Sequence, residues 1–326
     1  MRSIGLMLGP EGDVRFPWMD GTTYPLEVWF YTVRAALCEM DAVVARQQLF
    51  QTPITLRRSH PKPVQRAGRT RAAGITLRVG AGRNQGRRGY MEDVDFAHPT
   101  VSCGRRSVGL YGVLDGHGGA DCAAFVADEL PSVLAACLRR HGGKSGTQGV
   151  DAPGDGEVLY QAFLDVDADY LSSTHSNAGS TANVLCWDKE TGIGFLANSG
   201  DTRTVVCGAD GRARDVTRDR KATTPEEVAR VATAGGFVAN GRVMGSLAVA
   251  RAFGDKALKI PLSAQGVPPC MVGDTSLKPR TAVTPAPELT MFCPRATDQF
   301  MVLATDGLWD VFSSQEAVDV VTGKAT

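Results

Sequence analysis

The sequence predicts an α+β fold in which largely antiparallel sheets are accompanied by a few helices. From about Gly74 onward, short apolar segments alternate with glycine-rich turns, a pattern typical of strands. Several of these segments follow one another with no helical pattern between them, and consecutive strands without a crossover helix pair antiparallel. The clearest strand candidates are Val108 to Leu114, Thr181 to Trp187, Ile193 to Ala197, Thr204 to Cys207 and Phe300 to Ala304.

Capping residues indicate two of the helices. Thr224 and Glu227 have the spacing of a capping box, proline stands between them at the first helical position, and Gly235 ends the helix. Ser313 and Glu316 repeat the pattern near the end of the sequence. A capping box satisfies backbone donors that the first helical turn leaves open, so both sites predict helix N-termini.

Two longer helices are expected in the first half of the sheet region. One follows Gly119 and is interrupted at Pro131, because proline removes a backbone donor. The other runs from Glu157 to about Leu171. Residues 141–156 are rich in glycine and lack periodicity, which predicts a surface loop.

Composition describes a globular chain without overall charge. Its 326 residues are 43% hydrophobic and 21% charged, enough to bury a large core. Because 35 basic residues balance 35 acidic ones, no net field attracts nucleic acid, and we expect no nucleic-acid partner. The eight cysteines form no CxxC pair, and we interpret them as reduced core thiols.

No targeting segment is recognisable. The N-terminus lacks a charged-then-apolar signal pattern, its acidic residues argue against a transit peptide, and Arg2 excludes the myristoylation motif. No uncharged apolar stretch is long enough to span a bilayer, so we expect no stable membrane insertion. A cytoplasmic or nuclear location is the resulting expectation.

Residues 1–73 differ from residues 74–326 and are expected to form an N-terminal extension. Apolar residues recur in steps of four and three from Leu26 to Val44, which predicts an amphipathic helix of about 25 residues. We favour packing of this helix 26–44 on the protein's own body, with a partner surface as the alternative. The stretch between Asp41 and Glu92 has no acidic residue and many basic ones. We interpret it as a solvated tether, with a nuclear address or an anionic docking strip as alternatives.

Three acidic motifs carry the chemistry. Asp115 begins an Asp-Gly-His-Gly-Gly run after one strand candidate, Asp306 follows another, and Glu92-Asp93 lies upstream. A carboxylate at the end of a buried strand is costly unless something positive meets it. The glycine after each strand-end aspartate allows close backbone approach, and gathered oxygen ligands suit hard cations such as Mg²⁺ or Mn²⁺.

Six motifs follow one another along the chain. They are Arg88-Gly89-Tyr90-Met91-Glu92-Asp93, Asp115-Gly116-His117-Gly118-Gly119, Gly179-Ser180-Thr181-Ala182, Ala197-Asn198-Ser199-Gly200-Asp201-Thr202-Arg203, Leu247-Ala248-Val249-Ala250-Arg251-Ala252-Phe253-Gly254-Asp255 and Asp306-Gly307-Leu308-Trp309-Asp310-Val311. Together, over roughly Gly74 to Val321, they resemble the metal-dependent PP2C (PPM) family of protein serine/threonine phosphatases. The resemblance implies an α/β/β/α sandwich of two mainly antiparallel sheets flanked by helices, with a two-metal site at one end.

The resemblance also implies a role for each acidic residue. Asp115 would bridge two Mn²⁺ or Mg²⁺ ions, Glu92 and the Gly116 carbonyl would complete the protein ligands of the second ion, and Asp306 would bind the first. Asp93 would hold water in the outer shell of the site. Asp201 resembles the aspartate that recruits a third, weaker ion in this family, and a purely structural role in a turn is its equal alternative.

The catalytic assignments also make chemical sense from the residues. Paired cations activate water and screen the phosphate charge. The serine or threonine alkoxide needs a proton, which His117 is placed to supply as general acid. Arg88 would grip two phosphate oxygens and orient the substrate. We interpret Arg251 and Asp255 as a structural ion pair.

The sequence departs from the family pattern after Asp306. The family has a further aspartate in an Asp-Asn pair that opens a later strand, whereas only Asp310 and Asp319 follow here, so the domain is interpreted as C-terminally incomplete. Two interpretations compete: a fragment of a complete phosphatase, or a natural short form, a catalytically impaired pseudophosphatase that acts as a binding module. We favour the fragment, because a binding-only protein has no physical need for the full acidic set.

The function predicted from the sequence is therefore metal-dependent hydrolysis of phosphoserine and phosphothreonine in proteins. The expected partners are phosphoprotein substrates, and we expect a monomer. One further departure lies at residues 217–222, where Arg220 and Ala222 replace residues of the family's usual Asp-His-Lys-Pro, which argues against a second catalytic histidine.

Overall fold

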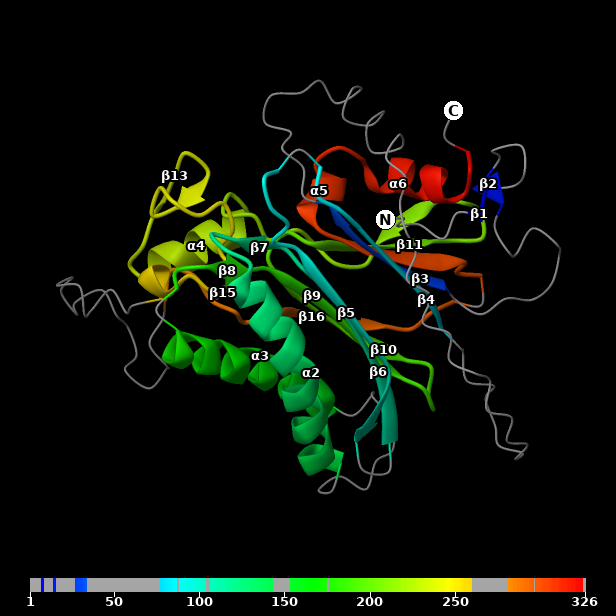
Figure 1. The fold of residues 1–326 in the computed structure, drawn as a ribbon, viewed down its shortest axis with the longest axis horizontal. Coiled ribbons are helices and arrows are strands. Elements are labelled where there is room, and N and C mark those ends of the chain that lie inside the picture. The colour runs from blue at the N-terminus through cyan, green and yellow to red at the C-terminus, as the bar shows by residue number, and fades with distance from the viewer. Residues whose placement is uncertain are drawn as a thin grey trace.

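The structure is a computed structural model in which two five-stranded sheets lie against each other, with helices on their outer sides (Figure 1). It describes residues 77–86, 88–103, 106–142, 153–174, 176–259, 281–295 and 297–324, together with the backbone of three short upstream strands. In the first sheet every neighbouring pair is antiparallel, in the order β16-β10-β9-β6-β5. Its strands are β5 (Val94–Cys103), β6 (Arg106–Leu114), β9 (Ala182–Asp188), β10 (Gly194–Ser199) and β16 (Glu288–Phe292).

The second sheet has the order β12-β11-β17-β3-β4. Its strands are β3 (Glu27–Val33), β4 (Arg78–Asn84), β11 (Arg203–Cys207), β12 (Ala213–Asp215) and β17 (Phe300–Ala304). Strand β3 runs parallel to both of its neighbours, β17 and β4, while the other pairs are antiparallel. The sheets are therefore mainly antiparallel, as expected from the sequence.

Small sheets and helices complete the described part of the chain. The small sheets are β1 (Met7–Leu8) with β2 (Val14–Arg15), β13 (Val238–Ala239) with β14 (Arg242–Val243), and β7 (Gly116–His117) and β15 (Phe253–Gly254) on either side of β8 (Gly179–Ser180). The helices are α2 (Asp121–Gly142), α3 (Pro153–Ser173), α4 (Pro225–Thr233), the 3₁₀ helix η2 (Lys256–Leu258), α5 (Asp306–Trp309) and α6 (Ser314–Val321).

Strand side chains alternate between the two faces of a sheet. Hydrophobic clusters therefore lie between the two sheets and between each sheet and its helices. On β6, Leu110 and Leu114 join the cluster formed with α2 and α3, whereas Tyr111 and Val113 join the cluster between the two sheets. On β17, residues 300 and 302 pack toward α5 and α6, and residues 301 and 303 face the first sheet. This arrangement confirms the expected α/β/β/α sandwich.

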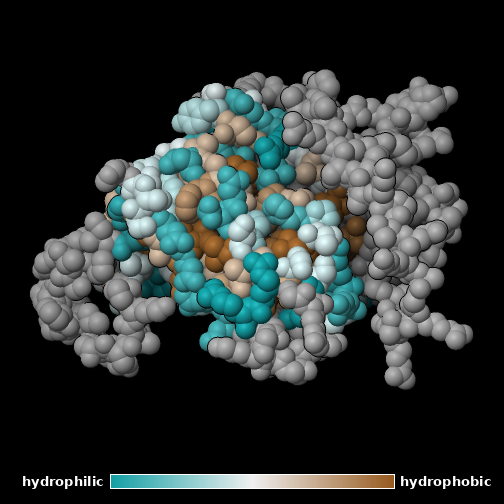
Figure 2. Space-filling model, turned by 60° about the horizontal axis from the view of Figure 1, so that its bottom comes forward, coloured by the Kyte–Doolittle hydropathy of each residue, from teal (hydrophilic) through white to brown (hydrophobic). Residues whose placement is uncertain are grey.

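Helix α2 corrects one prediction, since it continues through Pro131 without interruption. Leu130 and Leu134, on either side of the proline, are fully buried in the core between α2 and the first sheet. A proline inside a helix loses one hydrogen bond, and tertiary packing of this apolar face overrides that local cost. Figure 2, which brings this helical side forward, shows hydrophilic side chains around several apolar patches.

The other helix predictions have mixed outcomes. The capping box at Ser313 is present, with both reciprocal hydrogen bonds to Glu316. Helix α4 begins after Thr224 as predicted, but the capping box does not form: the Thr224 hydroxyl donates to the Lys221 carbonyl, and the Glu227 carboxylate binds two arginines. Helix α3 begins at Pro153, so the expected loop over 141–156 is wrong at its two ends, where 141–142 and 153–156 are helical. Residues 143–152 lie outside the described part.

The amphipathic helix expected over residues 26–44 is wrong over Glu27–Val33, which form strand β3. Residues 28–33 are all β-branched or aromatic, and such residues favour strands. An apolar run this short is compatible with both helical and strand periodicity. Pairing with β17 and β4 occupies both backbone edges of β3. Residues 34–44 and most of the basic linker lie outside the described part, and the division at residue 73 stays a prediction.

Two further observations concern the cysteines and the helices of the described residues. The structure describes six cysteines, all of them free thiols, and Cys103, Cys122, Cys186 and Cys207 are buried, in line with the interpretation as core thiols. No helix within the described ranges has the length and apolar character needed to cross a membrane.

Candidate functional site

Asp115 lies directly after β6, the strand of the first sheet that lies between β9 and β5. Its backbone is fixed on both sides by Thr181: the Asp115 N–H donates to Thr181 Oγ1 (3.2 Å), and the Thr181 N–H donates to the Asp115 carbonyl (3.0 Å). Because the apolar strand is buried up to Leu114, the chain places the Asp115 carboxylate at the end of this strand, where it is partly buried. The sequence pattern predicted this placement.

Asp306 reaches the same region from the other sheet. It follows β17 by one residue and begins α5, where a negative charge interacts favourably with the helix N-terminus. The intervening Thr305 donates its hydroxyl to Asp93 Oδ2 (3.1 Å). The end of β17 is thereby connected to the Glu92-Asp93 motif, which is more than 200 residues away in sequence.

Glu92 and Gly116 are in close backbone contact. Glu92 is buried, and its Oε1 accepts a 2.6 Å hydrogen bond from the Gly119 N–H. A Cβ atom added to Gly116 would lie 2.3 Å from the Glu92 carbonyl oxygen, so only glycine fits there. The glycine of the Asp-Gly-His motif therefore lets the two predicted ligand segments touch.

The acidic side chains are close enough to perturb one another strongly. Burial raises the pKa of Asp115 well above its usual value, and the neighbouring charges of Asp306, Asp93 and Asp201 raise it further. Burial likewise raises the pKa of Asp201 to about 7, with Asp306 adding to the shift and Lys221 opposing it. The structure therefore brings four of the sequence-predicted acidic residues into one electrostatic cluster, which we call the strand-end cluster.

The donor chemistry of the strand-end cluster fits a hard divalent cation. Asp306 is a close acidic neighbour of Asp115 and raises the pKa of that carboxyl group. Within the ranges that the structure describes, no three His, Cys, Asp or Glu side chains already surround one common ion position. Asp115 and Asp306 would hold such a cation in their ionised forms, and its positive charge would offset the repulsion that raises the pKa of Asp115.

His117 pairs with a residue that sequence reasoning assigned elsewhere. Its Nε2 lies 3.0 Å from both carboxylate oxygens of Asp255. The expected ion pair between Arg251 and Asp255 is wrong, because the Arg251 Nε donates to Glu227 (2.7 Å) instead. The reason is local: Gly254 and Asp255 both have positive φ angles, of 72° and 49°, which turn the two side chains toward different partners.

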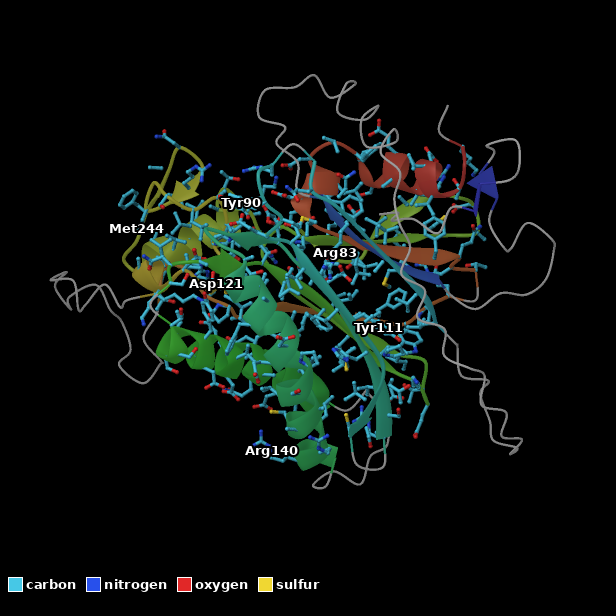
Figure 3. The ribbon with its side chains drawn as sticks, viewed as in Figure 1. Arg83, Tyr90, Tyr111, Asp121, Arg140 and Met244 are labelled. Atoms are coloured by element: carbon cyan, nitrogen blue, oxygen red, sulfur yellow. The ribbon has the colours of Figure 1, made fainter. Side chains whose placement is uncertain are left out.

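Two basic residues complete the description of the site. Arg88 is exposed in a turn where the Gln85 side chain donates to its carbonyl (2.7 Å), so its role in binding phosphate stays a prediction. Lys221, which sequence reasoning did not select, donates to Asp310 Oδ1 (2.8 Å) beside the strand-end cluster. Tyr90 and Asp121 lie at the end of the molecule where α2 starts, close to the β7–β8–β15 sheet (Figure 3).

Comparison with known proteins identifies the family. The family model for Protein phosphatase 2C matches residues 77–326. The chain is 34% identical over 266 residues to "Probable protein phosphatase 1N" of Mus musculus, covering 81% of this chain and 60% of that protein. It is 33% identical over 247 residues to "Protein phosphatase 1L" of Bos taurus, covering 72% of this chain and 60% of that protein.

Solved structures show the same fold. The serine-threonine phosphatase 2C from Toxoplasma gondii superposes with a TM-score of 0.56 at 21% identity, covering 72% of this chain and 78% of that one. A C. elegans sex determining protein superposes with a TM-score of 0.54 at 26% identity, covering 72% and 52%. The chain belongs to the protein phosphatase 2C family. It spans about 60% of the length of the two curated relatives named above.

Proposed function

We propose that this chain hydrolyses phosphoserine and phosphothreonine esters in proteins, using divalent cations held by the strand-end cluster. The observation that carries the proposal is the convergence of Asp115, Asp306, Asp93 and Asp201 at the ends of strands from both sheets, with His117 two residues after Asp115. Family membership supports the same class of reaction. The phosphatase names of the relatives give no support to a binding-only role.

The chain's own residues would hold the ions in the following way. Asp115 would contribute to both main ions, Asp306 to one, and Glu92 with the Gly116 carbonyl to the other. Asp93, tied to the end of β17 through Thr305, would act from the outer shell, and Asp201 would help to hold a third ion. When bound, Mn²⁺ or Mg²⁺ supplies Lewis-acid chemistry that activates water and neutralises phosphate charge.

The remaining steps fall to two residues outside the cluster. His117 would hold a proton and release it to the seryl or threonyl oxygen as the ester bond breaks. Arg88, at the exposed start of the segment that leads to Glu92, would bind the phosphate through its planar guanidinium. No covalent enzyme intermediate is needed. We also propose that the protein is a monomer that acts on phosphoproteins. We place it in the cytoplasm or nucleus, and the free cysteines of the described part support this location.

Phosphate release from a phosphoserine peptide at millimolar Mn²⁺ tests the proposal directly. The chain should release phosphate, excess chelator should stop the release, and Asp115→Asn should reduce it by at least about a hundredfold. Calorimetry on the same preparation should detect Mn²⁺ uptake by the unsubstituted chain and much weaker uptake by the variant. A folded chain that takes up no Mn²⁺ and releases no phosphate would overturn the proposal.

A further inference from the structure

The small β7–β8–β15 sheet joins three motifs that are far apart in sequence. His117 on β7 pairs in register with Gly179 on β8, and Gly179 pairs with Gly254 on β15. Asp255 follows Gly254 directly, which brings its carboxylate to His117 across 138 residues of sequence. The sheet therefore determines the geometry of one specific contact, the 3.0 Å approach of His117 Nε2 to both oxygens of Asp255.

Gly179, on the middle strand β8, has no side chain, and the His117–Asp255 contact fills the space where one would lie. A Cβ atom added to Gly179 would lie 2.3 Å from His117 Nε2 and 2.3 Å from Asp255 Oδ2. Real Cβ atoms do not approach this closely, so the space above Gly179 is filled by the histidine–aspartate pair. The glycine of the Gly-Ser-Thr-Ala motif is required by the pair and not only by the backbone.

Hydrogen bonds to Ala178 and Asp167 fix the backbone at Gly254 and Asp255. The Asp255 N–H donates to the Ala178 carbonyl (3.1 Å), and the Gly254 N–H donates to Asp167 Oδ1 (2.8 Å) on α3. Asp167 is in turn bound by the buried Lys259 ammonium at 2.6 Å. Asp255 adopts the left-handed conformation, which is unfavourable for a non-glycine residue and persists only where the surroundings hold it.

We propose that Asp255 is a positioning residue for His117: it accepts a hydrogen bond from Nε2–H and so leaves Nδ1 as the nitrogen that delivers the proton to the leaving group. An ionised carboxylate can only accept, so the contact selects which ring nitrogen carries its hydrogen toward Asp255. As water forms the new P–O bond, the ester P–O bond breaks and the seryl oxygen takes the proton from Nδ1. The water releases a proton to solvent, from which the histidine is recharged.

This inference rests on the proposed acid role of His117, and the choice of leaving group tests it. A seryl oxygen needs the proton, whereas the nitrophenolate of p-nitrophenyl phosphate leaves without one. With Mn²⁺ present, Asp255→Asn should lower kcat on a phosphoserine peptide at least about tenfold more than on p-nitrophenyl phosphate, with KM little changed. Asparagine is the suitable replacement because it tolerates the left-handed backbone.

A double-mutant cycle with His117→Gln sharpens the kinetic test. If Asp255 acts through His117, adding Asp255→Asn to His117→Gln should cause almost no further loss on the peptide. Equal losses on both substrates, or a full additional loss in the double variant, would overturn the inference. Those results would assign Asp255 a general structural role.

A spectroscopic readout tests the pair without relying on activity. In the metal-free, ¹⁵N-labelled chain at fixed pH, His117 should show a protonated Nε2 with slow solvent exchange, assigned by its absence in His117→Gln. Asp255→Gly, which also accepts the left-handed backbone, should abolish this signature while the backbone amide spectrum stays folded. An unchanged His117 signature in Asp255→Gly would overturn the inference. An unsubstituted chain inactive on both substrates would count against the proposed function alone, because the spectrum decides the pair separately.

Discussion

Two buried acidic regions of this molecule are balanced in different ways. In the strand-end cluster, the main neighbours of Asp115 are other acids, and its pKa is raised. On α4, the fully buried Glu227 binds both Arg230 and Arg251 at 2.7 Å. Although burial by itself would raise the pKa of Glu227, hydrogen bonds from Arg230 and the charge of Arg251 lower it.

The comparison teaches which acids serve the fold and which are available for chemistry. The arginines that bind Glu227 also donate to backbone carbonyls of Ala250, Thr281, Ala282 and Ala286, so this network ties α4 to neighbouring segments. Glu227 therefore needs no external partner. The strand-end cluster, in contrast, reduces its charge by binding protons, and a divalent cation would relieve the same repulsion.

The largest expected effect on stability comes from breaking the balanced region. Glu227→Ala leaves two partly buried guanidinium groups without their carboxylate and should lower the free energy of unfolding by about 3 kcal/mol. Urea unfolding of the metal-free protein measures it. The matched control is Glu226→Ala, one residue earlier on α4 with its side chain 61% exposed, which should change stability by at most about 0.5 kcal/mol. Similar losses for the two variants would contradict the contrast.

Neutralising the other region should have the opposite sign. Asp115→Asn replaces a partly buried carboxyl group whose ionised form is disfavoured by its acidic neighbours, so the metal-free protein should become more stable, with an increase in Tm of a few degrees, since each kcal/mol is worth about 2–4 °C at this size. Thermal unfolding with and without Mn²⁺ measures both effects, because Mn²⁺ should raise the Tm of the unsubstituted chain and not of the variant. Asp128→Asn, at an exposed position of α2, is the control. A destabilised Asp115→Asn would argue that the aspartate is structural.

The two regions should also respond oppositely to pH. Asp201 has a folded pKa of about 7 against an ordinary 3.8, so between these values the native state binds more protons than the unfolded state. Its contribution to the stability of the metal-free protein is therefore lost as pH rises from about 4 to about 7. Glu227 has a lowered pKa, so its contribution is present above its ordinary value of 4.5 and is lost as pH falls. Between pH 4 and 8, urea midpoints should fall less steeply with pH in Asp201→Asn than in the unsubstituted chain, with Asp115 contributing the remaining slope, and an unchanged slope would contradict the prediction.

The sequence predicted the strand-end cluster far better than the contacts around it. The apolar runs that end at Leu114 and Ala304 are local signals for buried strands, and polar residues that follow such a run lie at the end of the strand. The Arg251–Asp255 ion pair was expected from the sequence, but two consecutive positive φ angles separate the side chains. The actual partner, His117, is 138 residues away, and no local pattern in a single sequence encodes that distance.

The same limit explains the error in the second sheet. The apolar spacing around Phe30 fits a helical face, while the strand it forms is stabilised by backbone pairing on both sides. Those partners, β17 and β4, come from distant parts of the chain. Tertiary pairing of this kind overrides local periodicity when the segment is short and rich in β-branched and aromatic residues.

The smallest expected effect comes from Lys221, the cation that opposes the raised pKa of Asp201. Its ammonium binds Asp310 at 2.8 Å, and both side chains are about half exposed, 43% and 51%, so solvent screens the interaction. Lys221→Met removes one positive charge beside a cluster that would hold cations, and should tighten Mn²⁺ binding a few-fold without disturbing the fold. Calorimetric titration with Mn²⁺ at low and high salt measures this, with Lys324→Met, exposed at the end of α6, as the control. Because the effect is electrostatic, it should shrink at high salt, and a weaker Mn²⁺ affinity in Lys221→Met would show that the lysine helps to build the site.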